Sequence, residues 1–171
     1  MLRRIVNTLL CAAVALPLAA SAAPVPDDVQ KTLTTDYQLN CTAAQDPTDA
    51  NFAAAGALLA PDFVQIDFKG KTTQRDAFIA EQKQQLKQLH ITSCANTVTS
   101  STLSDASTIV VVVSAKVGGQ LQAPDGNHDI DAATSAQDTW KLENGAWLLT
   151  QSKDVSALVK VDGKVVQDEG N

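Results

Sequence analysis

The stretch from Gln137 to Lys153, QDTWKLENGAWLLTQSK, constrains the fold more than any other part of the chain. Asn144-Gly145 lies at its centre, and this dipeptide favours a type I′ hairpin turn because both central residues need positive φ. A turn there predicts four cross-strand pairs: Leu142 with Trp147, Trp140 with Leu149, Asp138 with Gln151, and Ala136 with Lys153. Cross-strand partners share one face of a sheet. Both tryptophans therefore lie on the buried face, and two polar side chains, Asp138 and Gln151, follow them into a predicted pocket.

The N-terminal residues have the pattern of a secretory signal peptide: two arginines, an apolar run and an Ala-Ser-Ala cleavage site. We predict a signal peptide over residues 1–22, cleaved after Ala22 or Ala23, and one domain over residues 23–171. The apolar run is short and rich in alanine for a membrane span, although a retained N-terminal anchor is the alternative. The mature protein is therefore expected to be exported, to a bacterial periplasm or to the medium.

The charge of the mature chain excludes some classes of partner. Without the two arginines of the signal peptide, 11 basic residues stand against 19 acidic ones, a net charge of −8. Such a chain is a poor ligand for nucleic acid and for anionic lipid. We therefore expect no nucleic-acid partner and no stable membrane anchor once the signal is removed.

Two cysteines, Cys41 and Cys94, remain after the signal peptide. In an oxidising compartment a disulfide between them is the first expectation, and two free buried thiols are the alternative. A redox role is disfavoured because the chain has no C-x-x-C motif and neither cysteine has a neighbouring histidine. Closing a loop of this length would stabilise the fold by about 4 kcal/mol.

The hydrophobic pattern changes from helical spacing to alternation near Ile91. Thr48 or Asp49 is expected to cap the second helix, and Thr73 with Asp76 resembles a capping box at the third. The predicted helices cover residues 27–44, 48–59 and 73–87; the predicted strands cover residues 63–68, 91–100, 108–117 and 132–142, followed by the rest of the hairpin and a terminal hairpin around Asp162-Gly163. This order predicts an α+β fold with helices on one face of a curved sheet.

Several short stretches resemble the SnoaL-like and ketosteroid-isomerase-like proteins of the nuclear-transport-factor-2-like superfamily. They are Leu58–Phe63, Gly70-Lys71 followed by Arg75-Asp76, Ser104–Ser107, Asp138-Thr139-Trp140 with Gly145-Ala146-Trp147, and Val161–Lys164. The resemblance covers nearly the whole mature chain. It implies a cone, in which an antiparallel sheet of about four to six strands curls around a cavity and three helices close its concave face. It does not imply one activity, because this fold carries enzymes, binding modules and oligomerisation domains.

The resemblance also implies candidate site residues. In relatives the position two before the first hairpin tryptophan lines the cavity, and here that position is Asp138. Family enzymes use an aspartate as general base and a tyrosine to polarise a carbonyl group, so the catalytic candidates are Asp138 and Tyr37. The ligand-binding candidates are Trp140, Trp147 and Gln151. The alternatives are a buried Asp138 carboxylate held by hydrogen bonds or by Lys153, and a Tyr37 that only packs on the sheet.

The two histidines carry weaker signals. His90 follows the third predicted helix, where a surface or capping role is the first expectation. His128 lies in a turn beside Asp125, Asp129 and Asp131, a cluster that suits loose metal binding but also ordinary turn chemistry. We predict no metal site and no cofactor, since the chain has no P-loop, no dinucleotide fingerprint and no H-E-x-x-H motif.

Three functions fit these patterns. The first is an exported protein with a pocket for a small, largely apolar ligand. The second is a lyase, isomerase or hydratase that uses Asp138 as general base. The third is a non-catalytic module that forms a homodimer through the outer face of the sheet. Whether the protein is an enzyme stays open at this point.

Overall fold

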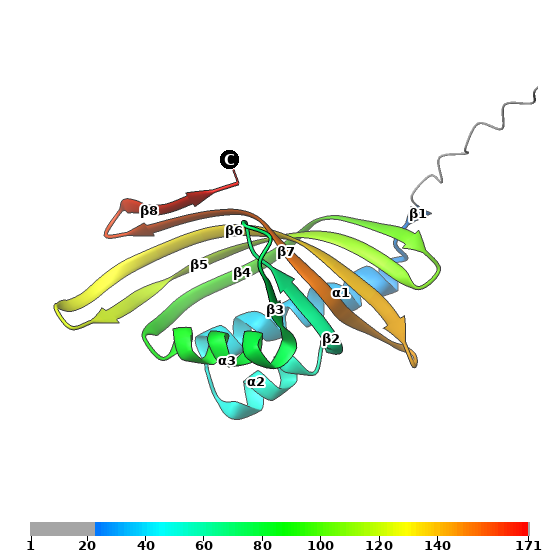
Figure 1. The fold of residues 1–171 in the computed structure, drawn as a ribbon, viewed down its shortest axis with the longest axis horizontal. Coiled ribbons are helices and arrows are strands. Elements are labelled where there is room, and N and C mark those ends of the chain that lie inside the picture. Colours follow the sequence, from blue (N-terminus) through cyan, green and yellow to red (C-terminus); the bar gives the residue numbers. More distant parts are fainter. Residues whose placement is uncertain (1–22, 171) are drawn as a thin grey trace, which may run out of the picture.

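The computed structural model describes residues 23–170, which form a sheet with helices on one side (Figure 1). The predicted signal peptide lies outside the described residues. The helices are α1 (Asp27–Gln45), α2 (Asp49–Gly56) and α3 (Arg75–Leu86). The strands are β1 (Ala23–Pro24), β2 (Leu59–Ile66), β3 (Thr72–Gln74), β4 (Leu89–Asp105), β5 (Thr108–Ala123), β6 (Gly126–Glu143), β7 (Ala146–Val161) and β8 (Lys164–Glu169).

The strands form one sheet in the order β1-β4-β5-β6-β7-β2-β3, and β8 also pairs with β7. Strands β4 to β7 form a long antiparallel meander, whereas β2 pairs with β7 in parallel. The meander arches over the three helices (Figure 1). The predicted α+β cone is therefore confirmed, with more strands than the predicted four to six.

Helix α1 is the element that packs closely on the sheet. Leu33, Tyr37 and Cys41 recur every four residues and are all buried, so they form the face that contacts β4 and the core. Two aspartates in the first turn stabilise this helix, because their negative charges lie near the positive N-terminal end of the helix dipole. The predicted disulfide is confirmed: Cys41 is bonded to Cys94 of β4, which joins α1 to the sheet.

The caps of the next two helices differ from each other. Thr48 caps α2 as predicted, since its hydroxyl accepts a hydrogen bond from the Asn51 amide at 3.3 Å. The capping box predicted at Thr73 is wrong: Gln74 is the N-cap residue of α3, and its side chain makes no capping hydrogen bond. The physical reason is that Thr73 pairs with Gln65 in the β2–β3 hairpin, which keeps its backbone extended.

The hairpin between β6 and β7 confirms the predicted turn but only part of the predicted register. Asn144 and Gly145 have φ angles of 50° and 84°, and Leu142–Trp147 and Trp140–Leu149 pair as predicted. Beyond them Thr139 pairs with Gln151, so Thr150 is an extra residue in β7 and forms a β-bulge. Its hydroxyl donates a hydrogen bond to the Thr139 carbonyl at 3.1 Å.

This bulge corrects the two remaining pairs. Asp138 lies opposite Ser152 and not Gln151, and Ala136 lies opposite Asp154 and not Lys153. A second register shift, at Val155, follows between the pairs Ser135–Ser156 and Ala136–Asp154. A one-residue shift moves a side chain to the other face of a strand, so the bulge replaces Gln151 by Ser152 beside Asp138.

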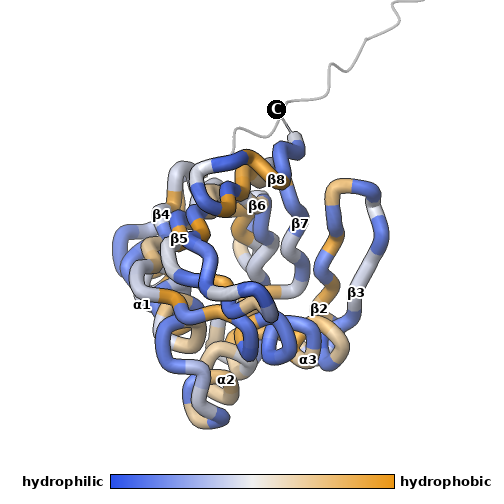
Figure 2. The backbone as a smooth tube through the Cα atoms, turned by 90° about the vertical axis from the view of Figure 1, so that its left-hand side faces the viewer, coloured by the Kyte–Doolittle hydropathy of each residue, from blue (hydrophilic) through white to orange (hydrophobic). Residues whose placement is uncertain are grey.

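The core lies between the sheet and the helices. Its largest fully buried side chains are those of Trp140, Phe63, Leu33, Ile109 and Val111, and Trp147 packs only partly buried against them. In Figure 2 apolar and polar residues alternate along the strands, as expected where one face of a sheet is covered. No helix in residues 23–170 is long and apolar enough to cross a membrane.

Candidate functional site

A cavity of about 390 Å³ lies between the helices and the covered face of the sheet. Its wall is built by all three helices and by strands β2 and β4 to β7. Most of the wall is apolar, and it includes the rings of Phe52, Phe63 and Phe78. Polar groups at the wall include the side chains of Tyr37, Asp138 and Ser152. The cavity therefore has the size and lining of a site for a small organic molecule.

Asp138 and Tyr37 meet at this wall. The Tyr37 hydroxyl donates a hydrogen bond to Oδ2 of Asp138 at 2.7 Å, and the indole N–H of Trp140 donates to the Tyr37 hydroxyl oxygen at 3.0 Å. The rings of Tyr37 and Trp140 lie edge to face, 5.6 Å apart. All three side chains are buried. The structure thus brings together both catalytic candidates, together with one of the three ligand-binding candidates.

The backbone of Tyr37 is held by Asn96 of β4. The Asn96 amide donates a hydrogen bond to the Tyr37 carbonyl at 2.8 Å and lies 3.4 Å from Sγ of Cys41. Asn96 is a site residue that the sequence reasoning missed. The signal was present, because Asn96 alternates with Cys94 and Val98 and therefore points to the covered face of its strand.

Burial controls the ionisation of this pair. Loss of hydration raises the pKa of Asp138, whereas hydrogen bonding by Ser152 and Tyr37 lowers it and the charge of Asp154 raises it slightly. Burial first, and then the charge of Asp138, raises the pKa of Tyr37, so the phenol keeps its proton at neutral pH. An acid whose folded-state pKa is raised destabilises the fold at high pH. The contribution of Asp138 to the free energy of unfolding therefore falls as the pH rises from the pKa of Asp138 in the unfolded chain to its higher pKa in the folded protein.

One carboxylate oxygen of Asp138 lacks a partner. Among residues 23–170, no group makes a hydrogen bond of good geometry to Oδ1, although the Ser152 hydroxyl lies near enough to favour the charged form. Asp138 as a whole is only 3% exposed. A buried acceptor without a donor costs about 1–3 kcal/mol, so this oxygen is a polar group that the described residues leave unsatisfied beside the cavity.

The other ligand-binding candidates lie apart from the cavity. Trp140 contributes through its hydrogen bond to Tyr37, but neither it nor Trp147 nor Gln151 lines the cavity wall. Gln151 is the strand partner of Val64 in the parallel pairing of β7 with β2. Lys153, the alternative partner of Asp138, lies opposite Gln137 and is exposed. Direct contact of these tryptophans or of Gln151 with a ligand stays a prediction.

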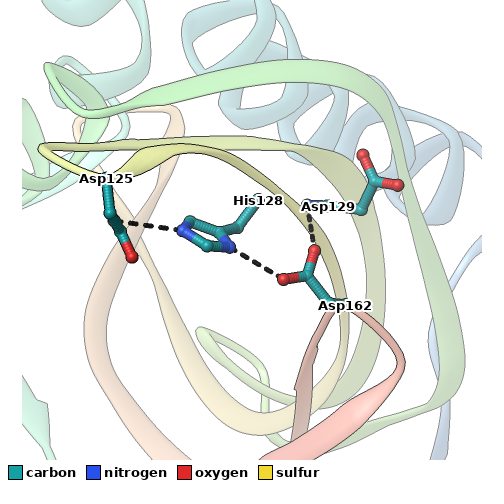
Figure 3. A network of polar contacts seen from close by, with 4 residues as sticks. All are labelled: Asp125, His128, Asp129 and Asp162. Carbon is teal, nitrogen blue, oxygen red and sulfur yellow. Dashed lines mark hydrogen bonds and ion pairs between the residues drawn. The ribbon is translucent and has the colours of Figure 1, made fainter.

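His128 lies in a separate polar cluster at the end of the sheet (Figure 3). Its ring contacts Oδ2 of Asp162 through Nδ1 at 2.7 Å and Oδ1 of Asp125 through Nε2 at 3.2 Å. Hydrogen bonding to Asp162, and then to Asp125, raises the pKa of His128. The cluster joins the β5–β6 turn to the β7–β8 turn. In the part of the chain that the structure describes, no group of His, Cys, Asp or Glu is arranged to hold a metal ion.

His90 is exposed and lies at the start of β4, where it pairs with Gln120 of β5. This agrees with a surface position for the side chain. The ring is outside the wall of the cavity.

Comparisons with known proteins find solved structures of similar fold at low sequence identity. No protein-family model and no curated protein matches the chain. An NTF2-like protein from Cytophaga hutchinsonii is 18% identical over 73% of this chain and 95% of its own, with a TM-score of 0.57. A ketosteroid-isomerase-like protein from Erwinia carotovora atroseptica is 12% identical over 77% and 99%, with a TM-score of 0.59. A hexachlorocyclohexane dehydrochlorinase, LinA type 2, is 11% identical over 75% and 86%, with a TM-score of 0.57.

Such low identities with matched architecture show a shared fold and leave activity open. The TM-scores of 0.57 and 0.59 show that the architecture of this chain, a sheet that arches over three helices, matches these structures over most of their length. The chain therefore has the nuclear-transport-factor-2-like (NTF2-like) fold, as the resemblance of its sequence predicted.

Proposed function

We propose that this protein is an exported small-molecule-binding domain whose cavity holds a small, largely apolar ligand oriented by Asp138. The observation that carries the proposal is the cavity of about 390 Å³ with an apolar wall and one buried carboxyl group. Ligand sites of proteins combine such a wall with a few well-placed polar groups. Asp138 supplies an acceptor oxygen without a partner, and Tyr37 holds the carboxyl group in place.

Two observations support export. The pattern of residues 1–22 is that of a signal peptide, and the chain holds a disulfide between Cys41 and Cys94. Disulfides persist in the periplasm and outside the cell and are rare in the cytosol. Export places the binding site where small molecules from the surroundings are met first.

Binding in the cavity can be tested with two phenylalanine substitutions on the same strand. Ala136 lines the cavity, whereas Ala133 points to the opposite face of β6. We expect the uncharged dye N-phenyl-1-naphthylamine to show a saturable rise in fluorescence with the wild-type protein. Ala136→Phe should weaken the affinity by about tenfold or more, because the new ring occupies the cavity. Ala133→Phe should leave it unchanged.

Circular dichroism should show that both variants are folded before the titrations are compared. Equal affinity of the dye for Ala136→Phe and the wild type would place the dye outside this cavity and would contradict the proposal. Native mass spectrometry of the purified protein adds a direct readout, since a ligand retained by the wild type should be absent from Ala136→Phe.

The second candidate function is catalysis with Asp138 as general base. It is favoured by one observation, the carboxyl group whose pKa burial raises and whose Oδ1 has no partner at the cavity wall. A base in such a setting is better matched to proton abstraction near neutral pH than an ordinary aspartate. Among proteins of similar fold, one is a dehydrochlorinase, which makes proton abstraction a reasonable chemistry for this cavity.

The test is exchange of deuterium for protons next to the carbonyl of small cyclic ketones, followed by NMR in deuterated buffer. The wild type should accelerate exchange, and Asp138→Asn should lose at least about 100-fold of that rate, the usual size of one general-base contribution. The variant should still bind the ketone. Unchanged exchange in Asp138→Asn would remove Asp138 as the base.

A further inference from the structure

The cavity wall has one charged side chain among the described residues, and it is acidic. In residues 23–170 no lysine, arginine or histidine lines the cavity, and Asp138 is the one acidic side chain that does. Two more carboxyl groups act on the site from nearby, since the charge of Asp154 raises the pKa of Asp138 and that of Asp36 raises the pKa of Tyr37.

Two cations lie behind the wall and not on it: Arg75 donates to the carbonyls of Leu59 and Gly56, and Lys83 lies over the ring of Phe52. An anion inside the cavity would therefore meet like charge at the wall itself.

The direction of the hydrogen bonds leaves Asp138 as an acceptor. An indole N–H can only donate, so the Tyr37 oxygen accepts from Trp140 and the Tyr37 proton goes to Oδ2 of Asp138. Burial raises the pKa of Asp138, whereas hydrogen bonding by Ser152 and by Tyr37 lowers it and so favours the charged form of the carboxyl group. The hydrogen bonds at the wall thus suit a carboxylate, and its buried oxygen Oδ1 has no hydrogen-bond partner among the described residues.

The aromatic side chains of the wall suit the same kind of ligand. The rings of Phe63 and Phe78 are 5.3 Å apart and tilted, and both line the cavity together with Tyr37. The faces of aromatic rings attract cations, and sites that bind substituted ammonium groups use several such rings. An apolar wall alone would suit any small apolar molecule. A carboxylate without a cationic partner favours those that also carry a positive charge.

We propose that the ligand of this cavity is an organic cation: a small apolar molecule with a protonated amine that donates a hydrogen bond to Oδ1 of Asp138. This inference rests on the proposed binding function and narrows it to one chemical class. The ammonium group supplies both the donor that Oδ1 lacks and the positive charge that the wall lacks.

The test compares molecules that share a body and differ in charge. Two series are titrated by calorimetry at neutral pH: adamantan-1-amine, adamantan-1-ol and adamantane-1-carboxylate, and 2-phenylethylamine, 2-phenylethanol and 3-phenylpropanoate. In at least one series the amine should bind about tenfold or more tightly than the alcohol, the size expected of one charge-assisted hydrogen bond. The carboxylate should bind most weakly.

Two isosteric variants locate the effect. Asp138→Asn should reduce the amine-to-alcohol affinity ratio to about one, because the charge that distinguishes the two ligands is gone. Asp154→Asn is the matched control, because Asp154 is partly buried and close to Asp138 but does not line the cavity. It should lower the ratio far less than Asp138→Asn does, because the charge of Asp154 acts on the site only from outside the cavity.

The wild type alone provides a second readout that needs no variant to fold. The titratable groups acting on Asp138 are Tyr37 from α1 and Asp154 from β7, and Tyr37 stays neutral. The affinity for the amine should fall as the pH drops through the pKa of Asp138, whereas that for the alcohol should not. Asp154→Asn should keep this pH dependence.

The outcomes separate this inference from the function on which it rests. Alcohols that bind as tightly as the matching amines would overturn the organic-cation inference and leave the binding function intact. A pH-independent amine affinity would also overturn it. If no member of either series binds the wild type, and the dye does not bind either, the inference and the binding function both fail.

Discussion

Replacing Trp140 by alanine should lower the free energy of unfolding by about 3–5 kcal/mol, the usual cost of truncating a large buried aromatic side chain. Trp140 is 1% exposed and lies at the centre of the core. The substitution also removes the edge-to-face contact with Tyr37 and the hydrogen bond from the indole N–H to the Tyr37 oxygen. Denaturation in guanidinium chloride, followed by circular dichroism, measures the loss.

Trp147 is the matched control for this experiment. It lies in the same hairpin and on the same face, but it is only partly buried at the margin of the core. Trp147→Ala should therefore cost less than about 2 kcal/mol, in proportion to the smaller apolar area that leaves the core. Equal losses for the two variants would show that the two tryptophans stabilise the core equally and would contradict the deeper burial of Trp140.

Removing the disulfide should have an effect of similar size. A Cys41→Ser and Cys94→Ser double variant should lose about 4 kcal/mol of stability, because the bond closes a loop across 53 residues and restricts the unfolded chain. For a domain of this length the melting temperature should fall by roughly 10 °C. Calorimetry of the wild type and the double variant measures this difference.

Reductant provides the control for the disulfide. It should lower the melting temperature of the wild type towards that of the double variant and leave the double variant unchanged. Alkylation without reductant followed by mass measurement is a separate check. Full labelling of Cys41 and Cys94 in the native, unreduced protein would show two free thiols and would remove the basis of the prediction.

The sequence predicted those helices and turns that depend on residues close together in the chain. The four-residue spacing of Leu33, Tyr37 and Cys41 predicted the buried face of α1, and Asn144-Gly145 predicted the hairpin turn. Both signals come from residues near one another in the chain, where backbone geometry alone decides which side chains share a face. The resemblance extended these elements to the whole fold.

The errors arose where contacts between strands compete with local preference. Thr73 matches a capping box but is held extended by its pairing with Gln65. Uniform alternation placed Gln151 beside Asp138, whereas the bulge at Thr150 places Ser152 there. The sequence around Thr150 contains no signal for a bulge, because the extra residue is accommodated by the twist of the paired strands and not by its own conformation.

By itself the sequence determined the helices, the long strands, the hairpin turn and the buried position of Asp138. Only the tertiary structure decided which polar groups meet Asp138. Tyr37 lies 101 residues away along the chain and reaches the carboxyl group because α1 packs across the sheet, close to the Cys41–Cys94 disulfide. Local spacing cannot encode such a contact, since it depends on how two separate elements cross. The same packing leaves Oδ1 without a partner at the cavity wall, the feature on which the proposed function depends.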